Sequence, residues 1–294
     1  MSAAQSDLVV NLAHEKEQHP SGTNTPRHQA KAGAALEELL AQFEHTDEPV
    51  IAVDMDDVLS QTNFVVAKWH NEAYGTNMGL EHFYYYHYWQ NPFWGTPEET
   101  FQKVEEFWKT NWIEIVPPVP GAVEGVQKLR DLGFRLVIVT ARQRREMERA
   151  HKWLDDHFPK GTFASMICTG QSQETLGETP DNVLTVKLSK AGVCHRLKAK
   201  LMIDDSLENC LKCVHADPPV PTLLFGDNAW NQRESKYTDI KAEVSFDQKL
   251  KKEGGREFWK EEVVELPKGA PLTRVKGWDE VVAYVEAAKK DGKI

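Results

Sequence analysis

The chain has 294 residues, of which 40% are hydrophobic and 27% are charged. This composition is ordinary for a globular protein and excludes a wholly disordered chain, a collagen-like chain and a coiled-coil rod. The formal net charge of −10 argues against a protein that binds nucleic acid polymers or anionic membranes, because such binding needs an excess of Lys and Arg.

Four cysteines are too few for a disulfide scaffold. The N-terminal stretch has no basic region followed by an apolar region, so it does not resemble a secretory signal. No apolar run reaches the ~18 residues of a membrane span. We therefore expect a cytoplasmic protein.

The first part of the chain changes character twice. Residues 1–31 are polar and without a sustained period, which predicts a disordered tail. Residues 32–45 carry leucines and a phenylalanine at helical spacing and predict an amphipathic helix. Residues 50–53 (VIAV) then form a short apolar run, typical of a strand that is buried on both faces.

Further strands and helices alternate along the rest of the chain. Apolar runs that predict strands recur at 134–140, 163–169, 199–205 and 221–227. Helical patterns lie at 121–133, 142–158 and 277–290. This alternation predicts an α/β protein with a mostly parallel sheet and helices on both faces.

About 80 residues separate the first two strands, too many for one crossover helix. Residues 83–112 hold 12 of the 28 aromatic residues in the chain. We interpret 62–116 as an inserted helical, aromatic-rich cap, and 32–61 together with 117–294 as the core. Most of these aromatics are expected to form the interior of the cap, while a few of those between Phe83 and Trp94 could stack on a substrate ring.

Acidic and hydroxyl residues follow three of the predicted strands. Asp54 and Asp56 stand at the end of the first strand, Thr140 at the end of the second, and Asp204 and Asp205 at the end of the fourth. The carboxyl ends of parallel strands meet at one edge of a sheet, where ligands bind in open α/β folds. Carboxylates in this number suit Mg²⁺, and Lys190, at the start of a predicted helix, would supply a further cation to the same site.

The spacing of Asp54 and Asp56 allows two roles, because residues i and i+2 of an extended segment project to the same side. An ionised Asp54 could attack phosphorus. Asp56, with a pKa raised by burial and by its neighbour's charge, could protonate the leaving oxygen. Thr140 and Lys190 would then stabilise the phosphoryl group.

The motifs VDMDDVL, VIVTAR, LSK and LMIDDS occur in that order and resemble motifs one to four of the haloacid dehalogenase (HAD) superfamily of phosphatases. The resemblance implies a HAD-like Rossmannoid core with a C1-type cap. It also implies that Asp54 is the nucleophile, that Asp56 is the general acid and base and a metal ligand through its carbonyl, and that Thr140 and Lys190 are the remaining motif residues. Asp205 would be a direct Mg²⁺ ligand, supported by Asp204.

Within the superfamily, the chain is similar to the 5′(3′)-deoxyribonucleotidases and their microbial relatives. The likeness lies in the aromatic cap, in PPVPGAVEGVQKLRDLGF, in IDDSLEN and in LFGDNAWNQ. It implies hydrolysis of a small-molecule phosphate ester, with nucleoside 5′- or 3′-monophosphates as the first expectation, through an aspartyl-phosphate. A phosphotransferase, a catalytically silent binding protein and a homodimer remain open alternatives.

Two features have an alternative structural interpretation. Arg142 could bind the substrate phosphate, or it could be an exposed residue in the first turn of the following helix. Cys210 and Cys213 have a spacing seen in metal sites, but a fourth ligand is not evident, and a helix there would place both cysteines on an apolar face.

Overall fold

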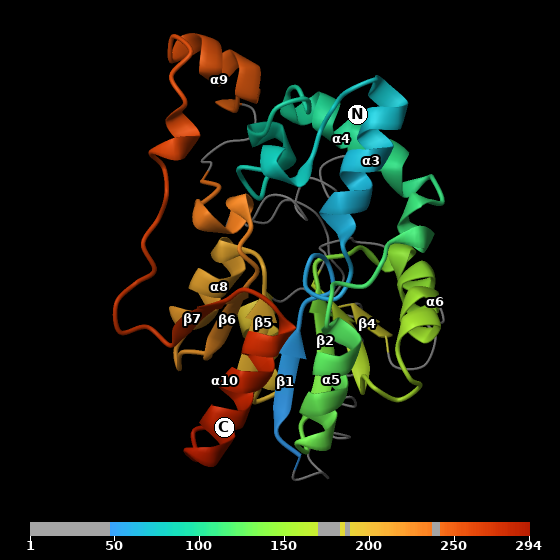
Figure 1. Cartoon of the computed structure of the whole chain (residues 1–294), viewed down its shortest axis with the longest axis vertical. Coiled ribbons are helices and arrows are strands. Elements are labelled where there is room, and N and C mark those ends of the chain that lie inside the picture. The colour runs from blue at the N-terminus through green and yellow to red at the C-terminus, as the bar shows by residue number, and fades with distance from the viewer. Residues whose placement is uncertain (1–47, 170–182, 186–188, 237–241) are drawn as a thin grey trace, which may run out of the picture.

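The computed structural model describes residues 48–169, 183–185, 189–236 and 242–294. The predicted disordered tail, 1–31, and the predicted helix at 32–45 both lie outside these residues. In the described part of the chain a sheet forms the lower half of the molecule in Figure 1, and helices α3, α4 and α9 lie above it.

The sheet is parallel throughout, with the strand order β4-β3-β2-β1-β5-β6-β7. Each strand is short and rich in aliphatic residues. The strands are β1 (Val50–Val53), β2 (Arg135–Thr140), β3 (Ser165–Cys168), β4 (Val183–Thr185), β5 (Leu201–Asp204), β6 (Thr222–Phe225) and β7 (Leu272–Val275). The sequence did not predict β4 and β7, which lie at the two edges of the sheet.

Helices cover both faces of the sheet, which confirms the predicted α/β class. One face packs against α5 (Ala122–Asp131), α6 (Met147–His157) and α10 (Trp278–Lys290). Figure 1 shows β1 between α10 and α5 in this view. The other face packs against α7 (Lys190–Arg196) and α8 (Leu207–Val214).

The alternation of side chains along β1 explains this two-sided core. Ile51 and Val53 belong to the hydrophobic cluster on the α5 and α10 face, while Val50 and Ala52 belong to the cluster on the α7 and α8 face. Cys210 and Cys213 lie on α8 and are fully buried free thiols, as expected for the apolar face of a helix.

The segment between β1 and β2 contains α3 (Thr62–Tyr74), α4 (Pro97–Trp108) and short 3₁₀ helices at Leu80–His82, Tyr88–Gln90 and Trp112–Ile115. It has its own hydrophobic cluster, built largely from aromatic side chains such as Phe83, Trp94 and Phe107. We call residues 62–116 the inserted segment. Its division from the rest of the chain as a separate cap domain stays a prediction.

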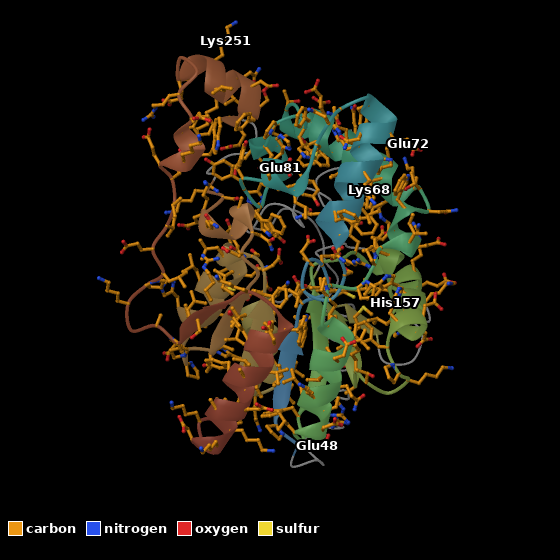
Figure 2. All side chains as sticks on the ribbon, viewed as in Figure 1. Glu48, Lys68, Glu72, Glu81, His157 and Lys251 are labelled. Atoms are coloured by element: carbon orange, nitrogen blue, oxygen red, sulfur yellow. The ribbon has the colours of Figure 1, made fainter. Side chains whose placement is uncertain are left out.

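The C-terminal part of the chain returns to the inserted segment before it ends on the sheet. Helix α9 (Phe246–Lys252) and a short 3₁₀ helix at Phe258–Lys260 pack against Tyr84 and Tyr85. In Figure 2, Lys251 of α9 and Glu48, just before β1, lie at opposite ends of the molecule. None of the helices in the described part of the chain combines the length and hydrophobicity needed to cross a bilayer.

The pKa of His70 reports on the packing of the inserted segment. It is fully buried on α3, its Nδ1 lies 2.8 Å from the Thr76 hydroxyl, and burial together with the charge of Lys103 lowers its pKa to about 4. An unfolded chain protonates this ring near its ordinary pKa of 6.5. The folded state therefore loses stability as the pH falls from about 6.5 towards 4.

We predict that His70→Asn removes this part of the pH dependence of the free energy of unfolding. The part due to His70 amounts to about 3 kcal/mol below pH 4. The measurement is urea unfolding of wild type and variant at several pH values. If the free energies of unfolding of wild type and variant differed by the same amount from pH 7 to about pH 4, the lowered pKa of His70 would be contradicted.

Candidate active site

The site is centred on the chain that leaves β1. The backbone N–H of Asp54 donates to the carbonyl of Ile203 at 2.9 Å, so Asp54 still belongs to the β1–β5 pairing. Its carboxylate is buried and accepts the backbone N–H of Met55 at 2.8 Å. The chain then turns sharply, and Asp57 adopts a φ of 56°, in the left-handed region.

Lys190 connects the ends of β1 and β5. It begins α7, and its ammonium lies 2.8 Å from Asp54 Oδ2 and 2.7 Å from Asp204 Oδ2. The lysine side chain is 4% exposed, so these carboxylates replace the water that it loses. The other oxygen of Asp204 accepts the backbone N–H of Ser206 at 2.9 Å, at the start of α8.

Asp54, Asp204 and Asp205 form a group that could hold a metal ion. Each is buried, and one carboxylate oxygen from each lies within 4.8 Å of the others. Burial outweighs the attraction of Lys190 and raises the pKa of Asp54 to about 7. Burial and the charges of Asp57 and Asp204 raise the pKa of Asp205 well above its usual value.

The carboxylates of the site outnumber the cations beside them, so the protein compensates their negative charge only in part. One cavity is lined by four carboxylates, those of Asp54, Asp56, Asp57 and Asp205. The guanidinium of Arg142 also lines it. Buried carboxylates in excess of their cations are costly unless a metal binds them. Hard oxygen donors so grouped fit Mg²⁺, which would be held by Asp54 and Asp205, with Asp204 close by.

Asp56 has different neighbours from Asp54. Arg142 forms a forked contact with its carboxylate, from Nε to Oδ2 at 3.0 Å and from Nη2 to Oδ1 at 2.6 Å, and the Thr62 hydroxyl donates to Oδ1 at 2.5 Å. Burial alone would raise the pKa of Asp56, but the charge and hydrogen bonds of Arg142 outweigh it and lower the pKa. The sequence-based expectation of a raised pKa at Asp56 is therefore wrong, because it overlooked this ion pair.

Thr140 is the last residue of β2, and Arg142 follows the strand. The Thr140 hydroxyl is fully buried and accepts the backbone N–H of Arg142 at 3.2 Å. Thr140 does not line the cavity that Asp54 and Asp56 share. Arg142 is 5% exposed and precedes the helices of its segment, so it is not an exposed residue in a first helical turn. The catalytic and ligand roles of all these residues stay predictions.

Sequence reasoning missed three residues that support the acids. The Trp230 indole N–H, from the segment after β6, donates to Asp205 Oδ2 at 2.6 Å. Thr62 donates to Asp56 from the start of α3. Asp57 accepts the backbone N–H of Asn63 at 3.0 Å and so fixes the same helix end. Only Asp57 had a signal in the sequence, because it is a further acid within the motif VDMDDVL.

Aromatic residues of the inserted segment close the cavity from above the sheet. Tyr86, Tyr88 and Trp108 line it, together with Val104 and the acids. Of the other candidates for substrate stacking, Phe83 and Trp94 are buried in the cluster of the inserted segment, and Tyr84 stacks on Trp259 with ring centres 4.9 Å apart. Trp108, predicted to belong to the cap interior, packs there and also borders the cavity.

Comparison with known proteins gives one match by sequence family. Residues 48–180 match the family described as 5′ nucleotidase, deoxy (pyrimidine), cytosolic type C protein. Over residues 48–180, this match confirms the resemblance to the nucleotidases that the motifs predicted. No curated protein matches the chain.

Solved structures give distant likenesses. The chain is similar to a predicted phosphatase from Clostridium acetobutylicum, at 14% identity and a TM-score of 0.46 over 82% of this chain and 100% of the other. A HAD family hydrolase from Deinococcus radiodurans R1, with bound phosphate and sodium, is similar at 14% identity and a TM-score of 0.43, over 82% and 96% of the two chains. Likenesses at this level bear on neither activity nor substrate.

The contact between Trp230 and Asp205 generates a prediction about metal affinity. Trp230→Phe keeps an aromatic ring at this position but removes the indole N–H, so the Asp205 carboxylate loses this hydrogen bond. Loss of a partner that orients a metal ligand typically costs about 10- to 100-fold in affinity. We expect a weakening of that size for Mg²⁺ by isothermal titration calorimetry, and no binding at this site in Asp205→Asn. Equal Mg²⁺ affinity in wild type and Trp230→Phe would show that Asp205 does not depend on the tryptophan.

Proposed function

We propose that the protein is a Mg²⁺-dependent phosphomonoesterase of the HAD type, starting from the match of residues 48–180 to the cytosolic type C 5′-nucleotidase family. The observation that carries the proposal is the buried group of Asp54, Asp204 and Asp205, with Lys190 between Asp54 and Asp204. Its proposed substrate is a small phosphate ester, and the reaction proceeds through an aspartyl-phosphate on Asp54.

Asp54 is the proposed nucleophile because of where its oxygens lie. One oxygen accepts the Met55 N–H and the other contacts Lys190, so the carboxylate is held in one orientation at the end of β1. A bound Mg²⁺ would keep Asp54 ionised and neutralise charge on the phosphoryl oxygens. Lys190 holds Asp54 and would screen the charge that develops on the phosphoryl group, while Thr140 would donate a hydrogen bond to it.

Asp56 is the proposed acid and base. In the first step Asp54 forms a bond to phosphorus, the bond to the leaving oxygen breaks, and Asp56 donates a proton to that oxygen. In the second step Asp56 accepts a proton from the water that attacks phosphorus, and Asp54 is released. The ion pair with Arg142 favours the carboxylate form, which the second step requires, and the proton that the first step consumes is the one that the second step returns to Asp56.

The aromatic lining of the cavity supports nucleoside monophosphates as the substrate class. Tyr86, Tyr88 and Trp108 border the same cavity as Asp54 and Asp56, so a ring attached to the phosphate would meet aromatic surface. A phosphotransferase that uses another acceptor than water stays an alternative, because the same nucleophile would serve it. Glycerol, which can accept a phosphoryl group in place of water, is therefore added to the assay.

We expect Mg²⁺-dependent release of phosphate from a panel of phosphomonoesters, and no release with EDTA. Asp54→Asn should lower kcat at least about a thousandfold, because the amide cannot form the acyl phosphate, while thermal unfolding stays close to wild type. Glycerol added as an acceptor separates transfer from hydrolysis. Wild-type activity in Asp54→Asn would exclude Asp54 as the nucleophile.

A second prediction concerns the leaving group. Tyr86→Leu should raise KM for deoxynucleoside monophosphates about fivefold to tenfold, since an aromatic contact contributes about 1 kcal/mol. It should leave KM for glycerol phosphate unchanged. Tyr84→Leu is the matched control, because Tyr84 stacks on Trp259 rather than lining the cavity. Equal changes for both esters would argue against base stacking at Tyr86.

A further inference from the structure

Three consecutive tyrosines of the inserted segment have different surroundings. The ring of Tyr84 stacks on Trp259, with ring centres 4.9 Å apart, and the hydroxyl of Tyr85 donates to the Glu262 carboxylate. Tyr86 instead lines the cavity of the active-site carboxylates. Because an aromatic ring is carried by its own backbone, the position of the backbone at Tyr86 sets how far this ring reaches into the cavity.

Ser235 holds the backbone of Tyr86 from another part of the chain. Its hydroxyl oxygen accepts the backbone N–H of Tyr86 at 2.8 Å and, over a longer distance of 3.4 Å, that of His87. Ser235 is 4% exposed. An N–H group that loses its acceptor in such a buried place destabilises the backbone that carries it, so the hydroxyl of Ser235 favours one position of this backbone.

Asn91 holds the same turn from within the inserted segment. Its side chain accepts the backbone N–H of Tyr85 at 2.8 Å and donates to the carbonyls of Tyr85 and His87, each at 2.9 Å. These bonds fix the shape of the turn, but they do not fix its distance from the acids. That distance depends on contacts with the core, of which the bond from Tyr86 to Ser235 is the one at the cavity-lining residue itself.

Ser235 is in turn tied to the helix that follows the metal-binding acids. Its backbone N–H donates to the carboxylate of Glu208 on α8, the helix that begins two residues after Asp205. Earlier in the same stretch, the indole of Trp230 donates to Asp205 Oδ2 at 2.6 Å. The stretch 230–235 therefore connects the backbone of the tyrosine turn with the part of the core that carries the metal-binding acids.

We infer that Ser235 is a positioning residue for the leaving group, because it places the Tyr86 ring as the wall against which a ring of the leaving group packs. The inference rests on the proposed function. It assigns part of substrate selection to the chain beyond residue 180, where the match to the nucleotidase family ends. Other residues are proposed to hold the phosphoryl group, so Ser235 acts on the binding of ring-bearing esters and leaves the chemical steps unchanged.

The test measures KM and kcat of Ser235→Ala with two esters. One is the deoxynucleoside monophosphate that wild type hydrolyses best, and the other is glycerol phosphate, which has no ring. We expect KM for the deoxynucleoside monophosphate to rise about threefold to tenfold, the size of a lost aromatic contact. KM for glycerol phosphate should stay unchanged, and kcat for both esters should stay within about twofold of wild type.

Two further variants test whether the serine acts through the ring. Ser235→Thr keeps the hydroxyl acceptor and should return KM for the deoxynucleoside monophosphate close to wild type. Ser235→Ala combined with Tyr86→Leu should raise this KM no further than Tyr86→Leu alone, because both changes remove the same wall.

Ser245→Ala is the matched control. Ser245 is also buried, and its hydroxyl also accepts a backbone N–H, that of Gln248 at the start of α9, at 3.2 Å. Loss of this helix cap should lower the temperature of thermal unfolding and leave KM for both esters unchanged.

The outcomes separate a positioning role of Ser235 from a structural one. Equal rises of KM for both esters would overturn the inference, because the serine would then hold the inserted segment as a whole. Unchanged KM for both esters with a lower unfolding temperature would overturn it in favour of a purely structural hydrogen bond. If wild type hydrolyses neither ester, the proposed function fails and the inference with it, whereas failure of the inference alone leaves wild-type turnover of both esters intact.

Discussion

The structure depends on how buried negative charge is balanced where β1 and β5 end. Asp54 and Asp204 share the ammonium of Lys190, Asp56 is paired with Arg142, and Asp205 receives only the Trp230 indole N–H among its described hydrogen bonds. Two cations face more carboxylates than they can neutralise, and burial raises the pKa of both Asp54 and Asp205. A divalent cation would neutralise the excess carboxylates. A phosphate ester would then be held by that cation and by Lys190.

The inserted segment is connected to this charge cluster by specific contacts rather than by apolar packing alone. Thr62 and Asp57 join the start of α3 to the loop after β1, and Arg142 and Trp108 join the end of α4 to Asp56. The start of α3 therefore contacts Asp56 directly, and the end of α4 contacts it through Arg142. Asp56 is the group whose role changes between the two proposed steps, so its orientation is the quantity that such contacts can control.

Much of the core and the location of the site followed from local sequence pattern. Short aliphatic runs gave β1, β2, β3, β5 and β6, because strands buried on both faces need no alternation. The edge strand β7 was missed because Leu272, Thr273 and Arg274 are partly or fully exposed and carry no apolar run. The partners of the acids could not be predicted, since Arg142 is 86 residues from Asp56, and Trp230 is 25 residues from Asp205. Such pairs arise from the path of the chain in space, and so the lowered pKa of Asp56 was not foreseen.

The most direct test of the account is to identify the residue that carries the phosphoryl group. Asp56→Asn, with p-nitrophenyl phosphate and Mg²⁺, should release one equivalent of p-nitrophenol rapidly and then stall, because the leaving group needs no acid and the second step has lost its base. Acid quench and borohydride reduction should then convert residue 54 into homoserine, detectable by peptide mass spectrometry. Steady release with no burst, or a reduced acyl phosphate at any residue other than Asp54, would contradict the proposed mechanism.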